Sequence, residues 1–111
     1  MGRNRTADLL QGALELLVLR LLRSQPLNGW DIMHRLQLVS GDVLTVTAGS
    51  LYPALHRLEA RGFVSASWTL SENNRRARVY RITAAGRRQL ETERETWQRF
   101  SGAVDALLRD A

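Results

Sequence analysis

The apolar positions of residues 7–23 recur at helical spacing and cover most of the circumference of the expected helix. A continuous apolar face consists of Leu10, Leu14, Leu17, Val18 and Leu21, and four further leucines widen it. A helix that is apolar on nearly all sides is normally covered on more than one of them. A small domain offers only one core, so this breadth predicts a second covering surface.

A turn and a second helix follow. Residues 24–29 contain Pro26 and read as a turn, and Asn28 is a suitable N-cap for a helix over residues 29–39. Small and polar residues at positions 40–42 end this helix, and a short apolar bridge leads on to Thr47.

A third helix is predicted in the stretch TAGSLYPALHRLEAR, residues 47–61, where Leu51, Leu55 and Leu58 fall on one stripe. Thr47 or Ser50 is a suitable cap. Proline lacks the backbone amide that a helix interior needs, so Pro53 favours a start near Gly49 or Ser50. The other faces carry Ser50, Tyr52, His56 and Arg57. Such a helix is either an ordinary surface helix or one whose polar flank meets an electronegative partner.

After Gly62 the helical period gives way to alternation. Residues 63–69 and 77–83 predict two strands of a hairpin. The polar tip between them contains Glu72, Asn73, Asn74, Arg75 and Arg76. Alone, such a tip would be a solubilising turn; beside a polar-faced helix, it indicates contact with an anionic partner.

The last helix is predicted over residues 84–108, with Thr83 as its cap. Leu90, Trp97, Phe100, Val104 and Leu107 form a heptad-like stripe. At 1.5 Å per residue the helix extends about 37 Å, more than a domain with a radius of gyration of about 13 Å can cover. A two-fold homodimer accounts for this stripe and for the wide first helix; pairing of the two helices within one chain is the alternative. The predicted interface comprises Leu10, Leu14, Leu17, Leu90, Trp97, Phe100, Val104 and Leu107.

The charge of the 111-residue chain is uneven. All sixteen basic residues are arginine, and the net charge is +5. Residues 1–62 contain seven arginines and five acidic residues, and residues 63–90 contain six arginines and one acidic residue. Residues 91–111 contain three arginines and five acidic residues. The positive excess therefore lies in the hairpin and the start of the last helix. Arginine suits bidentate pairing with phosphate and guanine, although exclusive use of arginine also follows from a genome's composition.

Several classes of function are not expected. The chain has no cysteine, and no apolar run approaches the roughly 18 residues of a membrane span. The N-terminal residues do not resemble a signal peptide, so a soluble cytoplasmic protein is expected. Two histidines, no glycine-rich phosphate loop and no spaced carboxylate pair give no basis for catalysis, a cofactor or a metal site.

The order of elements predicts a mainly α fold with a small β-hairpin. Residues 7–83 form a winged helix-turn-helix DNA-binding domain, and residues 84–111 a C-terminal dimerisation helix. In this fold the third helix enters the major groove of DNA and the hairpin, or wing, lies on the neighbouring backbone. A winged helix that binds protein or RNA is the alternative, because fold alone does not fix function.

Several motifs resemble the PadR family of bacterial transcriptional regulators. They are GDVLTVTAGSLYPALHRLEARGFVSASW, ENNRRARVYRITAAGRRQL and ETW, together with the opening LLQGALELLVLRLL and the turn PLNGWDI. The similarity covers residues 9–108, and the single terminal helix is similar to the shorter form of the family. Trp30 departs from the family, which more often has tyrosine there.

The resemblance implies a dimeric repressor of a nearby gene or of its own gene, released by a small hydrophobic effector. Family members meet DNA with the third helix and the wing, and some bind flat compounds between subunits through an aromatic side chain that Trp97 matches. Trp97 is alternatively an interface residue and nothing more. With the polar positions noted above, the predicted DNA-binding residues are Thr47, Ser50, Tyr52, His56, Arg57, Asn74, Arg75, Arg76 and Arg78.

Overall fold

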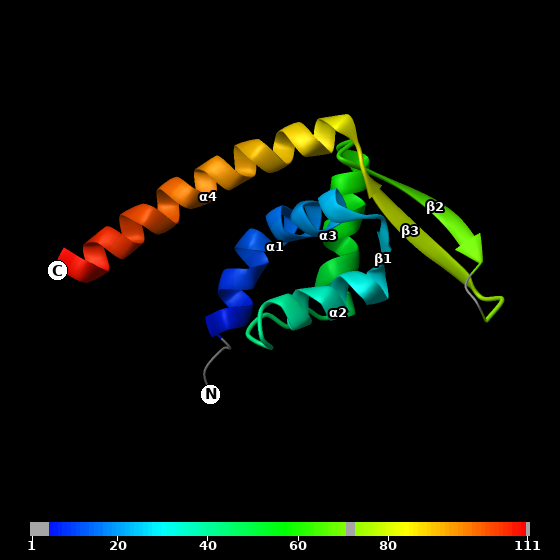
Figure 1. The fold of residues 1–111 in the computed structure, drawn as a ribbon, viewed down its shortest axis with the longest axis horizontal. Helices are drawn as coiled ribbons and strands as arrows, with labels where there is room; N and C mark the ends of the chain where they lie inside the picture. Colours follow the sequence, from blue (N-terminus) through cyan, green and yellow to red (C-terminus); the bar gives the residue numbers. More distant parts are fainter. Residues whose placement is uncertain (1–4, 71–72, 111) are drawn as a thin grey trace.

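The computed structural model describes residues 5–70 and 73–110, which form four helices and a three-stranded sheet (Figure 1). In chain order the elements are α1 (Arg5–Ser24), β1 (Leu27–Asn28), α2 (Gly29–Val39), α3 (Ala48–Ala60), β2 (Val64–Leu70), β3 (Arg76–Ile82) and α4 (Ala84–Asp110). The mainly helical fold class with a small β component, predicted from the sequence, is confirmed.

α1 is the centre of the core. It contacts α2, α3, α4 and β3, because its broad apolar surface faces several neighbours at once. Leu14, Val18 and Leu19 are almost completely buried. The core that surrounds them contains Leu10, Leu22, Leu27, Ile32, Leu36, Val46, Leu51, Ala54, Leu55, Leu58, Val64, Tyr80 and Leu90.

Both ends of α3 are fixed by local hydrogen bonds. The Thr47 hydroxyl accepts from the amide of Ser50 at 3.2 Å, as an N-cap does. At the other end Gly62 adopts φ +80°, and the amide of Phe63 donates to the carbonyl of Leu58 at 2.9 Å. This bond and the left-handed residue are the features of a Schellman C-cap. The helix begins at Ala48, one residue before the predicted start, and it accommodates Pro53 in its second turn.

The turn predicted over residues 24–29 was wrong at its end, since Leu27 and Asn28 form strand β1. Leu27 pairs with Tyr80, and Asn28 with Val79, in an antiparallel sheet of order β1-β3-β2. Two residues are too few to show alternation, and their partner lies some fifty positions away. Asn28 nevertheless caps α2 as predicted: its side-chain oxygen accepts from the amide of Asp31 at 2.8 Å.

The hairpin is confirmed, with its strands shifted by one residue from the predicted limits. In its register Ala66 faces Tyr80, and Trp68 faces Arg78. Because directly opposed residues share a face of the sheet, the side that buries Tyr80 at the base of the hairpin carries Trp68 and Arg78 farther out.

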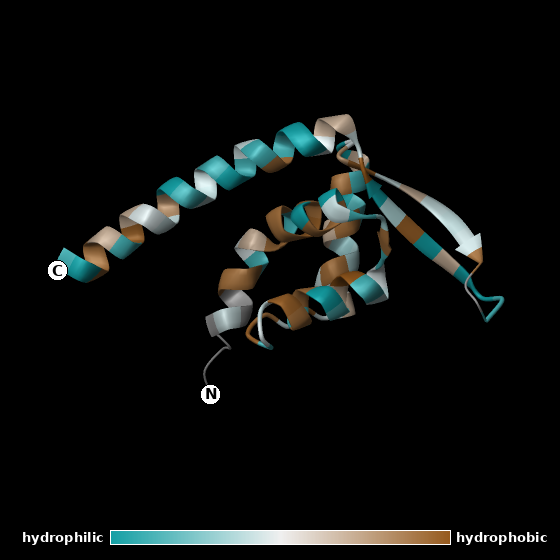
Figure 2. Cartoon of the chain, viewed as in Figure 1, coloured by the Kyte–Doolittle hydropathy of each residue, from teal (hydrophilic) through white to brown (hydrophobic). Residues whose placement is uncertain are grey.

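α4 leaves the hairpin, lies beside α1 and then extends beyond the body (Figure 1). The Thr83 hydroxyl accepts from the amide of Gly86 at 3.0 Å and donates to the carbonyl of Gly62 at 2.7 Å. Leu90 is buried, so the first turns of α4 belong to the core of the body. The distal half alternates hydrophilic and hydrophobic residues along its length (Figure 2), and Leu107 is 69% exposed.

Gly86 gives the first testable prediction. A Cβ at this position would clash with the backbone carbonyl oxygen of Phe63 and would lie 2.8 Å from Cγ1 of Ile82. Backbone cannot move aside cheaply, so overpacking in Gly86→Ala should cost about 1–3 kcal/mol and outweigh the helix-propensity gain of about 1 kcal/mol.

Gly102→Ala in the same helix is the matched control, because the added Cβ meets no atom of another described element within 4 Å. Thermal unfolding followed by circular dichroism should show a lower midpoint for Gly86→Ala and an equal or higher midpoint for Gly102→Ala. A shift in the same direction for both would refute the packing account.

Candidate nucleic-acid interface

One side of α3 is anchored and the other is exposed. Leu51, Leu55 and Leu58 are buried, as the sequence predicted. The opposite stripe consists of Gly49, Tyr52, Pro53 and His56, all of them exposed. This stripe presents little bulk apart from Tyr52 and His56, so the helix can approach a partner closely.

Tyr52 is held against the start of α2. Its ring occupies the space that a side chain at Gly29 would need: a Cβ there would lie 2.6 Å from Cζ of Tyr52. Tyr52 as a residue is 38% exposed. Tyr52 is therefore a surface residue of the α3 stripe with one face supported by α2.

The wing carries a stack of cations on an indole. The guanidinium carbons of Arg76 and Arg78 lie 4.7 and 5.3 Å from the ring centroid of Trp68, within the range of a cation–π interaction. Arg78 also forms an ion pair with Glu59 of α3 at 3.2 Å. This pair ties the wing to the helix.

Burial raises the pKa of Tyr80 above its ordinary value, and the neighbouring charge of Arg78 opposes that shift.

A hollow of about 430 Å³ separates α3 from the wing. It combines aromatic rings, cationic groups and hydrogen-bonding groups. Its lining consists of Asn28, Gly29, Trp30, Tyr52, His56, Trp68, Arg76, Ala77, Arg78 and Tyr80. The structure therefore brings together four predicted DNA-binding residues, Tyr52, His56, Arg76 and Arg78, from two separate elements.

Two of the arginines predicted to bind DNA, Arg57 and Arg78, form ion pairs with carboxylates of the same subunit. Arg57 pairs with Glu15 of α1 at 3.2 Å, and Arg61 pairs with the same carboxylate at 3.4 Å. Arg78 pairs with Glu59, as described above. Arg57 and Arg78 thus each have a carboxylate partner, which Arg57 shares with Arg61, and both arginines hold α3 against its neighbours.

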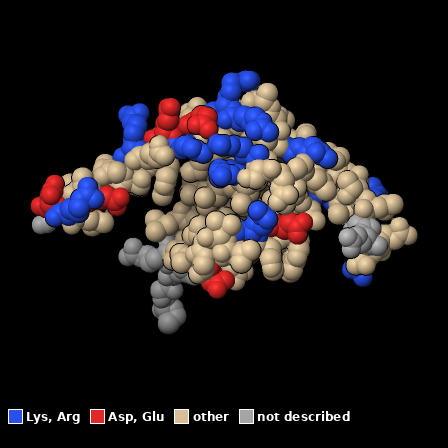
Figure 3. All heavy atoms as spheres, viewed as in Figure 1, with Lys and Arg blue, Asp and Glu red and all other residues tan. Residues whose placement is uncertain are grey.

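The remaining predicted DNA-binding residues lie at the ends of the site. Thr47 caps α3, and Ser50 is half-buried beside Thr47, lining a small hollow next to α1. At the hairpin tip Asn74 adopts φ +63°, and Arg75 next to it is exposed. In the view of Figure 3 basic side chains gather over the middle of the molecule and toward the hairpin, whereas the distal end of α4 carries both signs of charge.

The residues predicted for the dimer interface fall into two groups. Leu10, Leu14 and Leu90 are core residues of one subunit and have almost no surface to offer a second chain. This corrects their expected position: α4 packs on α1 within the chain over its first turns. The others keep exposed or half-buried surface: Leu17, Trp97, Phe100, Val104 and Leu107.

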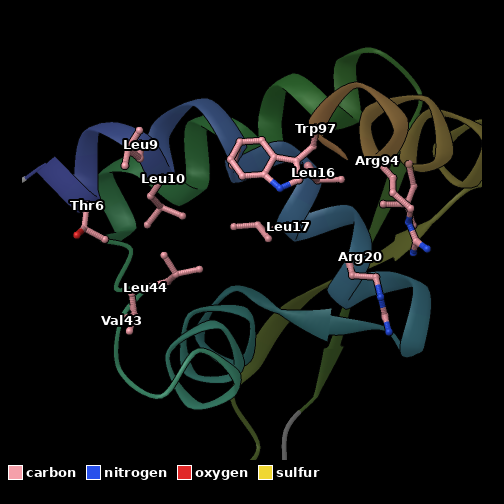
Figure 4. A pocket seen from close by; sticks show the side chains of 12 residues that line it. Thr6, Leu9, Leu10, Leu16, Leu17, Arg20, Val43, Leu44, Arg94 and Trp97 are labelled. Atoms are coloured by element: carbon pink, nitrogen blue, oxygen red, sulfur yellow. The ribbon is translucent and has the colours of Figure 1, made fainter. Parts of the chain in front are cut away.

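A second, mostly apolar hollow of about 530 Å³ lies where α1, α4 and the loop after α2 meet. Trp97 faces it from α4, opposite Leu17 of α1, with Leu44 on a third side (Figure 4). Arg20 and Arg94 lie toward one end of it. Trp97 is 44% exposed, so part of its indole remains available at the rim.

Two further observations concern the part of the chain that the structure describes. No group of three or more His, Cys, Asp and Glu side chains there is placed to hold a metal ion. None of its helices is both long enough and apolar enough to cross a membrane.

Sequence reasoning missed Trp30, Trp68 and Glu59. Alternation along the predicted strand gave the face on which Trp68 lies. Its contact with the arginines becomes visible only when the strand register places it opposite Arg78. The sequence pattern made Trp30 an apolar position of the second helix and a departure from the family pattern, but the residue is 67% exposed. Strand β1, which brings the start of α2 to the wing, was not expected.

The helix-turn-helix, packed on the core by one side of α3, and the basic hairpin beside it define a winged-helix protein. A cationic, aromatic surface lies between its third helix and its wing. The family profile described as "Transcriptional regulator PadR-like family" matches residues 18–92, and the chain belongs to this family of transcriptional regulators.

The chain is also similar to individual proteins. The chain is 41% identical over 90 residues to an uncharacterised 37.1 kDa protein in a transposon of Streptomyces fradiae, covering 81% of the chain and 24% of that protein. It is 41% identical over 59 residues to a transcriptional regulator of Mycobacterium tuberculosis, covering 53% and 54% of the two chains. The chain therefore matches about a quarter and about half of the lengths of these two relatives. A PadR-like transcriptional regulator from Bacillus cereus has a similar structure, with a TM-score of 0.80 at 26% identity over 94% of this chain and 99% of that one.

The contact between Gly29 and Tyr52 gives the second prediction. In Gly29→Ala the ring of Tyr52 must swing outward, which the partly exposed side chain can do, so the loss of stability should be about 0.5–1.5 kcal/mol. In a Tyr52→Ala background the same substitution should cost almost nothing. A double-mutant cycle of denaturant unfolding measures this coupling, and equal costs in both backgrounds would show that Tyr52 is not what restricts position 29.

Proposed function

We propose that this regulator binds double-stranded DNA, with α3 in the major groove and the wing against the neighbouring backbone. The observation that carries the proposal is that Tyr52 and His56 of the exposed α3 stripe line one hollow together with the Arg76–Trp68 stack of the wing. An α-helix with its side chains is about 10–12 Å across and the major groove is about 12 Å wide. The small residues Gly49 and Pro53 favour close entry.

Each part of the surface has its own role in this proposal. Tyr52 and His56 face base edges, and Ser50 lies at the entering end of α3. Arg75 and Arg76 bind phosphates, with Asn74 shaping the hairpin tip. Arg57 and Arg78 support this arrangement through their ion pairs with Glu15 and Glu59.

The proposal includes a two-fold homodimer. Exposed apolar side chains extend along α4, with Phe100 at 61%, Leu107 at 69% and Leu108 at 76%. Contiguous exposed apolar surface of this kind marks interaction sites. A second copy of α4 covers it without any further partner, and a two-fold axis places the two α3 helices on one side of an inverted-repeat operator.

Regulation by a flat hydrophobic effector extends the proposal. The apolar hollow beside Trp97 has a volume within the range of about 300–1,000 Å³ common for ligand sites. A compound stacked on Trp97 would change how α4 packs on α1 and so the spacing of the two α3 helices. In a protein whose only tryptophan is Trp97, quenching of its emission by planar aromatic compounds supports this role, and unchanged emission across a panel opposes it.

The mode of regulation proposed is repression of a nearby gene or of its own gene, in keeping with the family resemblance. Binding to single-stranded RNA or to another protein is the alternative. A cation-rich wing speaks against a surface for protein alone, and a two-fold pair of helices suits a duplex better than a single strand.

Salt dependence tests the DNA-binding proposal. With three to four phosphates bound by each subunit, log affinity for the duplex upstream of the gene should fall against log salt with a slope of about −5 to −7. Replacing both Arg75 and Arg76 with alanine should weaken binding to all sequences alike and make the slope shallower by up to about 4 for a dimer. Fluorescence anisotropy of labelled duplex measures both quantities.

Arg57→Ala is the matched control, because it removes a cation already paired with Glu15 and should leave the slope unchanged. Tyr52→Ala and Ser50→Ala should weaken the preferred site more than random DNA. A slope near zero, or tighter binding to single-stranded RNA of the same sequence, would overturn the proposal. Equal losses on specific and random DNA for both sets of variants would contradict the residue roles.

The dimer gives a separate prediction. Light scattering of the purified chain at micromolar concentration should give twice the 12.6 kDa subunit mass. Leu107→Glu places a charge in the exposed apolar surface of α4 and should shift the mass toward that of one subunit. Glu95→Gln, a change on an exposed polar position of the same helix, should not. A single-subunit mass for the unmodified chain would rule out this interface.

A further inference from the structure

We propose that the hollow between α3 and the wing binds the sugar–phosphate backbone of one DNA strand, with Trp30 and Trp68 as its two walls. This inference rests on the proposed function and adds two residues to it. Trp30 is 67% exposed and Trp68 is 54% exposed, although tryptophan is usually well buried. Both line the same hollow, one from α2 and one from β2.

The position of the hollow follows the geometry of a bound duplex. When α3 occupies the major groove, the strand that borders this groove passes directly alongside the helix. On the wing side of α3 that space is the hollow of about 430 Å³, with Tyr52 and His56 on the helix side and Arg76 on the wing side. In this proposal the bordering strand runs through the hollow, beside Trp30 and Trp68, to reach the wing.

The chemistry of the lining matches a sugar–phosphate chain. Phosphate is anionic, and the hollow offers the guanidinium of Arg76 and the two indole N–H groups as hydrogen-bond donors, while Tyr52 keeps its role toward the bases. Deoxyribose has apolar faces, and flat indoles can pack against them while their N–H groups reach a phosphate oxygen. This combination fits a backbone without reading its sequence.

Trp68 also fixes the cations that meet the phosphate. Arg76 and Arg78 both stack on its ring, and Arg78 is tied to Glu59. The ring face of Trp68 thus holds the guanidinium of Arg76 at the edge of the hollow. Among the described residues no carboxylate plays this part for Arg76. The charge of Arg76 stays available for phosphate while its side-chain freedom is reduced.

Trp30 has a support of its own. Its ring lies 5.9 Å from that of His34, one turn later on α2, with an angle of 30° between the planes. The first residues of α2 are held at the wing by the pairing of β1 with β3. The backbone that carries Trp30 is therefore held beside the wing, and His34 gives the indole one neighbouring ring.

The experiment follows tryptophan emission while DNA binding is measured independently. In a Trp97→Phe protein the emission comes only from Trp30 and Trp68; Trp97 lies on α4, outside the hollow. Two further variants, Trp97→Phe with either Trp30→Phe or Trp68→Phe, isolate each indole. Acrylamide quenching is measured with and without saturating duplex DNA, and anisotropy of the labelled duplex confirms binding.

The expected result is at least a twofold fall in the acrylamide quenching constant of each indole on saturation with duplex. If the duplex binds but the quenching constants do not change, the backbone site is wrong and the proposed function stands. If the duplex does not bind the unmodified chain at all, the proposed function itself fails. The two failures are therefore distinguishable.

Affinity gives a second readout. Trp30→Ala and Trp68→Ala should each weaken binding by about fivefold per subunit, the size expected for losing a small apolar contact area. The loss should be equal on specific and random duplex, because the backbone carries no sequence information. For Trp30→Ala the salt slope should stay unchanged, since no charge is removed, and unaltered thermal midpoints would exclude a merely structural effect. Unchanged affinity in both variants would overturn the proposal.

Discussion

The structure depends on the way α3 is held. Three leucines, Leu51, Leu55 and Leu58, bury one side of this helix in the core around α1, and ion pairs fasten its flanks. Glu15 of α1 binds Arg57 and Arg61 on one flank, while Glu59 of α3 reaches Arg78 of the wing on the other. Exposed pairs of this kind contribute little to stability. Their consequence is orientation: one stripe of α3 faces outward beside the wing.

Four arginines around α3 and the wing fall into two groups. Arg57 and Arg61 share the carboxylate of Glu15, and Arg78 pairs with Glu59, so these three act inside the subunit. Arg76 is instead positioned by the face of Trp68. An aromatic support restrains a guanidinium without neutralising it, so the wing can be both ordered and cationic. The charge count of the hairpin region alone could not separate these groups.

Much of the fold was predictable because it follows from local patterns. Helical spacing located α1, α2, α3 and α4, alternation located the hairpin, and capping chemistry at Asn28 and Thr83 marked two helix starts correctly. The exposed position of Tyr52 and the wing arginines also followed from the sequence. What could not be predicted depends on distant partners. Strand β1, the pairing of Arg57 with Glu15 and the burial of Leu10 and Leu90 need the tertiary arrangement.

We propose that two copies of this surface, joined through α4, read one side of a duplex. Hydroxyl-radical footprinting on the DNA upstream of the gene tests this arrangement. It should give two protected clusters on one face of the duplex, centred about 10–10.5 base pairs apart or at a multiple of that spacing. A single protected cluster, or no protection at protein concentrations that saturate the wild-type gel shift, would contradict it.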